Sequence, residues 1–313
     1  MTERFESEHD AEVRAAAFRF LGELAARSPG QVLDRGLLER GFEFRERRVP
    51  LMGPQGIFKP AVLPEVPLSI TTVPLREGRP RPYEDRFEGD CLLYRYRGRE
   101  PQHPDNVGLR LAMERRTPLV YFHGLVPGKY LAEWPVYIVG DDPSALTFRV
   151  HMDDPRVLDL SAAAELVAEN DAQTRRRYIT RATLQRLHQS DFRARVLRAY
   201  RECCAVCRLR HEELLDAAHI LPDGHPKGEP WVSNGLALCK IHHAAFDADL
   251  MGIRPDLVIE IREDVLKEKD GPMLRHGLQE LHGRTLVQVP RSHDLRPREE
   301  FLLERYEAFR RAV

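Results

Sequence analysis

Two pairs of metal-ligating side chains stand out in the second half of the 313-residue sequence. Cys204 and Cys207 are separated by two residues, and Cys239 and His242 repeat that spacing further along the chain. Zinc prefers four tetrahedral sulfur and nitrogen ligands, and a two-residue spacer lets both members of a pair reach one ion from a tight turn. The four side chains therefore predict a closed Cys3His site, which leaves no open position for a substrate and is structural rather than catalytic.

The other two of the five cysteines are expected to pack as small apolar side chains. Cys203 could take the place of Cys204 in the zinc site, but the spacing favours Cys204. Cys91 lies in a strand-like run and is expected in a core. The alternative for the whole group is a set of buried free cysteines that bind no metal.

Three further polar side chains remain in the same window once the zinc ligands are set aside: His219, Asn234 and His243. They belong to the short motifs AAHI, NGL and HHAAFD. In this order, over about residues 192–264, the motifs resemble the HNH endonuclease family. That resemblance implies a ββα-metal fold that presents a His, an Asn and a second His around one divalent cation.

The resemblance also implies a role for each of these residues. His219 would act as the general base that takes a proton from the attacking water, and a neutral imidazole with a pKa near ~6.5 suits that task. His243 would bind the catalytic ion, and Asn234 would support that ion or orient the base. Mg2+ or Mn2+ would stabilise the charge that develops on the phosphate and its leaving 3′ oxygen.

One position departs from the family pattern. Many HNH endonucleases carry an Asp or His immediately before the general base as a further metal ligand, and here that residue is Ala218. The ion would then be held by fewer protein ligands, recruit Asp216 or Asp247, or be coordinated by His219 itself.

Length, charge and hydropathy limit the class of protein. A chain of 313 residues exceeds the usual domain size of about 100–200 residues, so two modules are expected. The formal net charge of -1 excludes attraction to polyanions by bulk positive charge, though not a local basic surface. The polar N-terminus does not resemble a secretory signal, and no apolar run is long enough for a membrane span, so a cytoplasmic protein is expected.

Hydrophobic patterning predicts an α+β architecture with a β-rich first half. Strand-like runs cover 44–49, 68–73, 91–97, 119–125, 130–139, 146–150 and 257–261. Helical spacing covers 9–27, 31–40, 106–115, 162–201 and 298–311. The stretch 162–201 is rich in arginine, so it either contacts DNA phosphates or forms a solvated linker.

The β-rich half carries a second resemblance. The segments 53–60, 83–85, 94–98, 105–106 and 117–124 follow one another in an order similar to the SRA domain, which has a PUA-like twisted β-barrel and reads modified cytosine by flipping the base out of the duplex. The resemblance implies that Tyr83 and Tyr96 stack on the flipped base and that Asp85 or Glu84 accepts a hydrogen bond from its amine. The alternative is that these tyrosines pack within strands.

Together these patterns predict a modification-dependent restriction endonuclease of four segments. The expected parts are an N-terminal helical segment (1–42), an SRA-like reader (43–155), a helical basic linker (156–190) and a zinc-stabilised HNH nuclease with a C-terminal extension (191–313). The expected partner is double-stranded DNA with 5-methylcytosine or 5-hydroxymethylcytosine, cut by a homodimer. The alternatives are an HNH nickase or repair nuclease that ignores cytosine modification, and a non-catalytic DNA-binding protein.

Overall fold

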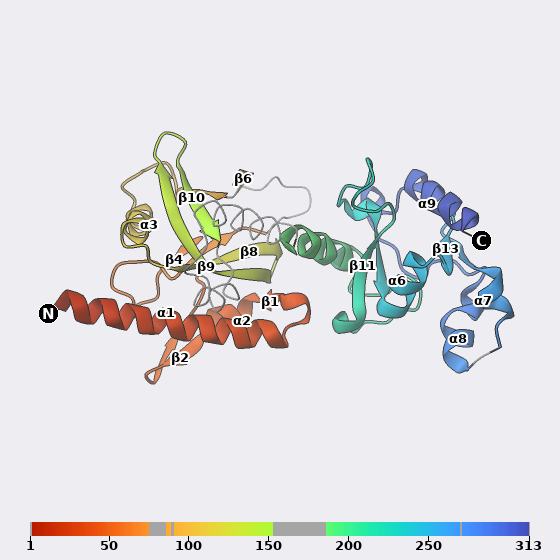
Figure 1. The fold of residues 1–313 in the computed structure, drawn as a ribbon, viewed down its shortest axis with the longest axis horizontal. Coiled ribbons are helices and arrows are strands. Elements are labelled where there is room, and N and C mark those ends of the chain that lie inside the picture. The colour runs from red at the N-terminus through yellow and green to blue at the C-terminus, as the bar shows by residue number, and fades with distance from the viewer. Residues whose placement is uncertain (1, 75–85, 89–90, 153–185, 270, 313) are drawn as a thin grey trace, which may run out of the picture. The chain divides into compact units, whose positions relative to one another are not determined.

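The computed structural model describes residues 2–74, 86–88, 91–152, 186–269 and 271–312 (Figure 1). The chain divides into two compact units, residues 1–187 and 188–313. Most of the predicted linker at 156–190 lies outside the described residues, so the four predicted boundaries stay predictions. Within the described part of the chain, no helix combines the length and the apolar character needed to cross a membrane.

A curled, eight-stranded sheet that forms half of a barrel is the centre of the first unit (Figure 1). Its order is β4-β5-β8-β9-β10-β7-β6, with β1 paired beside β9. All neighbours are antiparallel except β5 and β8. The strands are β1 (Leu33–Asp34), β4 (Ile57–Phe58), β5 (Ser69–Thr72), β6 (Arg86–Glu88), β7 (Cys91–Arg95), β8 (Leu119–Val126), β9 (Lys129–Asp142) and β10 (Thr147–Met152).

The predicted strands from residue 68 to residue 150 are confirmed, but the run 44–49 is not one strand. It lies in a hairpin of β2 (Phe42–Phe44) and β3 (Arg47–Val49) that turns at Arg45 and Glu46. Both turn residues have positive φ, 47° and 63°, as a tight hairpin turn requires. Neither residue is a Gly or Asn, so the sequence carries no turn signal at this point.

Two hydrophobic cores lie on opposite faces of the sheet. On one face, α1 (Thr2–Arg27) packs Val13, Ala17 and Leu21 in the same cluster as Phe122 of β8. This cluster also includes Leu38 of α2 (Arg35–Arg40), which follows a short turn η1 (Pro29–Gln31). On the other face, α3 (Pro104–Glu114) contributes Leu109 and Ala112. Every residue of β8 is buried, which explains why this strand reads as one apolar run.

Arg14 fastens α1 to the loops beside the sheet. Its side chain is 2% exposed and donates hydrogen bonds to the carbonyl oxygens of Val66, Pro67 and Pro118, at 3.2, 2.9 and 3.0 Å. It also pairs with Asp10 one turn earlier.

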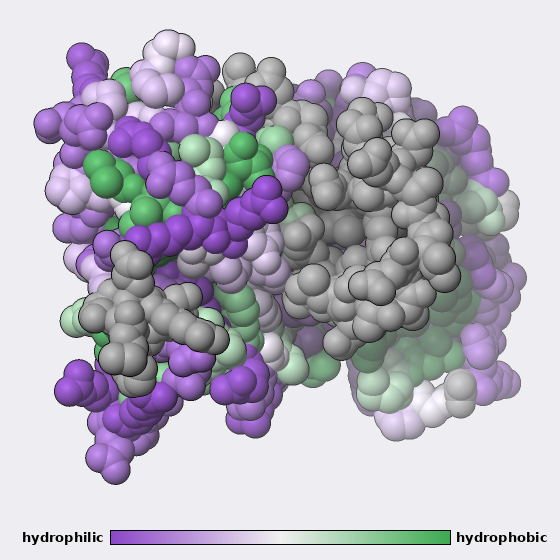
Figure 2. Space-filling view, turned by 60° about the vertical axis from the view of Figure 1, so that its left-hand side comes forward, coloured by the Kyte–Doolittle hydropathy of each residue, from purple (hydrophilic) through white to green (hydrophobic). Residues whose placement is uncertain are grey.

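The visible described surface is mainly hydrophilic, with small hydrophobic patches between charged side chains (Figure 2).

The second unit begins at residue 188, within a helix whose described residues are 186–199. After a turn that contains the cysteine pair come η2 (Glu212–Leu214), β11 (Leu215–His219), η3 (Val232–Asn234), β12 (Gly235–Cys239), α6 (Lys240–Asp247), β13 (Met251–Ile253) and β14 (Ile259–Ile261). The chain ends with α7 (Glu263–Lys267), α8 (Pro272–Gly277), η4 (Gln279–Leu281), η5 (His293–Leu295) and α9 (Glu299–Arg311).

The last helix packs back on this unit. Phe301, Leu302 and Phe309 of α9 are buried. Arg305 donates hydrogen bonds to Asp249 and to the carbonyl oxygen of Phe246, each at 2.6 Å. The C-terminal residues therefore cover the end of α6.

Candidate functional site

A ββα motif carries His219, Cys239, His242 and His243, while Asn234 lies just before its second strand and Cys204 and Cys207 lie in the turn that precedes the motif. Strands β11 and β12 are antiparallel and pair Leu215 with Cys239 at one end and His219 with Gly235 at the other. Helix α6 begins immediately after β12. His242 and His243 are consecutive on α6 and so point in different directions around it. His242 faces the cysteines and His243 faces Asp216.

The four predicted zinc ligands lie together. The ligand atoms of Cys204, Cys207, Cys239 and His242 are all within 4.8 Å of one another, close enough to hold one metal ion. His242 Nδ1 is 3.1 Å from Cys239 Sγ and 3.5 Å from Cys204 Sγ. Cys203 is buried outside the cluster, as the spacing predicted, and Cys91 is buried in the first unit.

The chemistry of this donor set fits zinc. His242 Nε2 lies 2.9 Å from the carbonyl oxygen of Gly277, so it can donate its proton there and present the Nδ1 lone pair to the metal. Burial alone lowers the pKa of His242, but hydrogen bonds with the sulfurs of Cys204 and Cys239 raise it to about 10. A positive charge is therefore favoured between these sulfurs, and a zinc ion supplies one. Gly277 is far away in sequence and carries no motif, so sequence reasoning missed it.

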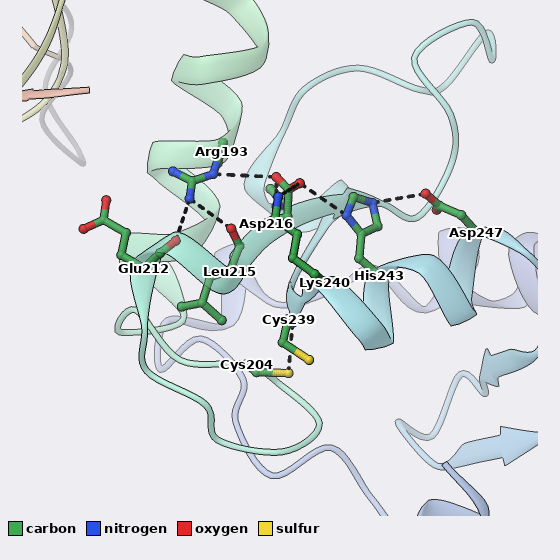
Figure 3. Close-up of polar contacts among 10 residues, drawn as sticks. Arg193, Cys204, Glu212, Leu215, Asp216, Cys239, Lys240, His243 and Asp247 are labelled. Atoms are coloured by element: carbon green, nitrogen blue, oxygen red, sulfur yellow. Dashed lines mark hydrogen bonds and ion pairs between the residues drawn. The ribbon is translucent and has the colours of Figure 1, made fainter. Parts of the chain in front are cut away.

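A charged network surrounds His243 (Figure 3). Its Nδ1 is 3.5 Å from Asp216 Oδ2, and its Nε2 is 3.2 Å from Asp247 Oδ2. Asp216 also contacts Lys240 at 3.0 Å and Arg193 at 3.6 Å. The two carboxylates proposed as replacements for the ligand missing at Ala218 are thus both beside His243.

These contacts fix the protonation of the network. Burial alone raises the pKa of Asp216, but hydrogen bonds from His243 and Lys240 outweigh burial and hold that pKa well below its usual range. The hydrogen bond to Asp216 raises the pKa of His243. Asp216 is therefore a carboxylate at neutral pH, a hard oxygen ligand of the kind that Mg2+ and Mn2+ prefer.

Asn234 closes the loop between β11 and β12. It is fully buried, its Oδ1 accepts a hydrogen bond from Leu221 N at 2.9 Å, and its Nδ2 donates to the carbonyl oxygens of Leu221 and Glu229 at 3.0 and 3.1 Å. These bonds engage both ends of the amide. The geometry gives Asn234 a positioning role, and its predicted binding of the catalytic ion has no support in these contacts.

His219 lies at the end of β11, half-buried. Its ring is stacked on Phe192, with centroids 3.9 Å apart and planes 13° apart. Its Nε2 is shielded from solvent and has no hydrogen-bond partner within the described residues. Burial lowers the pKa of His219, so the imidazole is neutral at physiological pH. Nδ1 is the other ring nitrogen of His219, and in a neutral imidazole a ring nitrogen that carries no proton can accept one.

The predicted base-binding residues are only partly described. Tyr83, Glu84 and Asp85 lie outside the described residues. Tyr96 is 2% exposed, its ring is stacked on Phe148, and its hydroxyl donates to Asp141. Tyr96 also lines a cavity of about 300 Å³ between the ends of β4, β5 and β7. The cavity is lined by residues 54–57, 71–73 and 94–98.

Three described arginines of the predicted basic run make contacts within the fold. Arg186 pairs with Glu133, and Arg195 pairs with Asp191 and donates to the Pro230 carbonyl oxygen. Arg193 donates to the carbonyl oxygens of Glu212 and Leu215, both at 2.9 Å (Figure 3). Arg198 and Arg201 are exposed. The earlier arginines of the predicted basic run, at 175–177 and 181, lie outside the described residues.

Comparison with known proteins agrees with this geometry. The family model described as HNH endonuclease matches residues 204–254, which include the cysteine and histidine cluster, His219 and the whole ββα motif. The second unit therefore contains an HNH endonuclease domain, and the chain is a DNA endonuclease, a hydrolase of phosphodiester bonds.

Two further comparisons, with solved structures and with curated proteins, give weaker results than the family model. A solved structure described as "Modification dependent TagI restriction endonuclease" is similar at 17% identity over 77% of this chain and 81% of that chain, with a TM-score of 0.31. No curated protein matches the chain significantly.

Proposed function

We propose that this DNA endonuclease cleaves double-stranded DNA that contains 5-methylcytosine or 5-hydroxymethylcytosine. Residues 43–155 would form an SRA-like reader, and 156–190 a helical basic linker. Residues 191–313 would form the zinc-stabilised nuclease. The N-terminal segment 1–42 supports the reader, since α1 and α2 complete one of its two cores.

The cavity beside Tyr96 is the observation that carries the reader proposal. A base flipped out of a duplex needs an enclosed pocket with an aromatic face and polar groups for its Watson–Crick edge. The cavity of about 300 Å³ is at the small end of ligand pockets and has Tyr94 and Tyr96 in its wall.

In the nuclease, each residue would act through the contacts described above. His219 would accept the proton of the attacking water at Nδ1. His243, with Asp216 or Asp247, would hold a divalent ion, Mg2+ or Mn2+, and Asn234 would hold the loop that follows His219. When bound, the ion supplies positive charge to the scissile phosphate and the leaving 3′ oxygen. Zinc at Cys204, Cys207, Cys239 and His242 would have a structural role.

Cleavage of matched plasmids tests the proposal. The same plasmid is prepared unmodified, with 5-methylcytosine and with 5-hydroxymethylcytosine, and is incubated with the full chain and Mg2+ or Mn2+. We expect cleavage of at least one modified plasmid and little of the unmodified one. Equal cleavage of all three would instead support an HNH nuclease that ignores modification.

The variant His219→Ala separates catalysis from binding. Loss of a general base lowers the cleavage rate by about 100-fold or more, whereas DNA binding should persist. If neither protein cleaves any of the plasmids although both bind DNA, the non-catalytic DNA-binding alternative is correct.

A further inference from the structure

We propose that Phe192 is a positioning residue for cleavage, whose ring holds the imidazole of His219 in the orientation that accepts a proton from water. This inference rests on the proposed role of His219 as the base. It does not depend on whether the enzyme reads a modified cytosine.

The two rings lie face to face. Their centroids are 3.9 Å apart and their planes differ by 13°, so one face of the imidazole is covered by the phenyl ring. Phe192 is 2% exposed and lies on the helix 186–199, outside the ββα motif and outside the residues 204–254 that the HNH endonuclease family model matches. A rigid helix therefore supports the base from outside the motif that carries it.

No hydrogen bond replaces this support. The orientation of a histidine base is usually fixed by a hydrogen bond from its second ring nitrogen to a carboxylate or carbonyl. For His219 the second nitrogen, Nε2, is shielded from solvent and has no partner among the residues that the structure describes. The stacked phenyl ring remains as the contact that restrains rotation of the imidazole.

Gly235 makes room for the stack. It is paired with His219 across the two strands. A Cβ at this position would lie 2.9 and 3.1 Å from two ring atoms of Phe192 and 2.5 Å from Cγ2 of Val196. Any larger residue would push the phenyl ring away from the strand pair and off the imidazole. The absence of a side chain at Gly235, the glycine of the NGL motif, therefore lets an aromatic ring lie across the β11–β12 pair.

Phe192→Leu and a matched control test the proposal. Leu keeps a buried apolar side chain but has no flat face. Leu197→Ala removes buried apolar volume from the same helix and the same core, away from His219. We expect kcat to fall about 10- to 100-fold in Phe192→Leu with KM for DNA unchanged, because small misplacement of a catalytic group has effects of this size. Leu197→Ala should lower Tm without a comparable loss of kcat.

A double-mutant cycle provides a second test. Gly235→Ala should also lower kcat, and the double variant Gly235→Ala with Phe192→Leu should lose no more than the worse single variant, since both act on one contact. Val196→Ala with Gly235→Ala removes the other close atom while leaving the clash with Phe192. This pair should stay as slow as Gly235→Ala alone.

A spectroscopic measurement is independent of activity. In full-length protein with labelled histidine, the ring current of Phe192 should shift the His219 carbon-bound protons upfield, and Phe192→Leu should remove that shift. A shift that is present while Phe192→Leu retains full kcat would overturn the positioning role. So would equal losses of kcat in Phe192→Leu and Leu197→Ala. A wild-type protein that does not cleave DNA at all would instead refute the proposed function.

Discussion

The protonation of His219 gives the nuclease its pH dependence at the scale of single residues. Burial, the largest cause, lowers the pKa of this imidazole, and nearby His243 lowers it further, while Asp223 and Asp247 oppose the shift. A base must be neutral to accept a proton, so lowering its pKa extends activity to lower pH. We expect the acid limb of kcat to lie below the range of an ordinary histidine, about 6.5.

NMR titration of labelled histidines measures the pKa of His219 directly. The lowered pKa of His219 also makes the stability of the folded state depend on pH. Below pH ~6.5 the unfolded chain binds a proton at this histidine that the folded chain resists, so the folded state loses stability as the pH falls through that range. An acid limb above pH ~7 would show that burial does not control this imidazole.

Asp216 and Asp247 can be separated by substitution. Asp216 is held by His243, Lys240 and Arg193, whereas the Asp247 side chain is 62% exposed and contacts His243 alone among its recorded ion pairs. We expect Asp216→Asn to raise the Mn2+ concentration needed for half-maximal cleavage about 10- to 100-fold, as loss of a ligand or its partner does. Asp247→Asn should have a smaller effect; the reverse order would assign the ion to Asp247.

Asn234 illustrates what sequence motifs can and cannot predict at this scale. The motif NGL singled out Asn234 for a role at the catalytic ion or the base, whereas the structure shows a buried amide with three backbone contacts in the loop between β11 and β12. The clustering of Cys204, Cys207, Cys239 and His242 was predictable because two-residue spacers place both members of a pair on one turn. Gly277 and Phe192 were not predictable, since each contacts a site residue across a long stretch of chain that no local pattern encodes.

Loss of Asn234 should loosen the loop between β11 and β12. Asn234→Ala leaves the N–H and the carbonyl oxygen of Leu221 without this partner and removes one of the two donors to the Glu229 carbonyl oxygen, so we expect about 2 kcal/mol less stability in denaturant unfolding. Asn234→Asp keeps the acceptor for Leu221 N and should fall between wild type and Ala. If Asn234→Ala is as stable as the wild type, the hydrogen bonds of Asn234 do not stabilise the loop between β11 and β12.

At the scale of elements, the metal cluster joins three segments of the second unit. The turn at Cys204, the β12–α6 junction and, through the Gly277 carbonyl, α8 all meet at it. At such sites the free energy of metal binding is largely free energy of folding. We expect Cys204→Ala to lose bound zinc and to expose β11, β12 and α6 to hydrogen exchange, while β8, β9 and β10 of the first unit stay protected.

Cys203→Ala is the matched control for that change. Its sulfur is buried one residue away but lies outside the cluster. This variant should keep its zinc content and most of its protection. Equal zinc content in Cys204→Ala and Cys203→Ala would show that the cluster is a set of free thiols.

Arg14 gives a comparable test for the first unit. Its position was unremarkable in the sequence, because one arginine on a charged helix resembles any other. Arg14→Met would leave the carbonyl oxygens of Val66, Pro67 and Pro118 without this donor, and we expect a loss of about 2–4 kcal/mol. Arg19→Met, on the exposed side of α1, should change stability by less than about 0.5 kcal/mol in the same unfolding experiment.

For the whole molecule, sequence patterning predicted the α+β class and most elements, because apolar periodicity reflects burial on one face of a helix or sheet. Sequence patterning did not predict which groups the arginines of the connecting helix contact. Arg193 and Arg195 belong to the arginine-rich run that was predicted either to contact DNA or to form a linker. Both donate hydrogen bonds to backbone carbonyl oxygens of the second unit.

The pairing of β11 with β12 also limits how this domain can change in evolution. Both strands have five residues, and their ends hold His219 at one side and Cys239 at the other. Deleting or inserting one residue in either strand would turn alternate side chains to the opposite face. The same event would carry Asp216 away from His243 and misplace a cysteine of the cluster. Substitutions can be tolerated in this hairpin, but changes of length should be selected against.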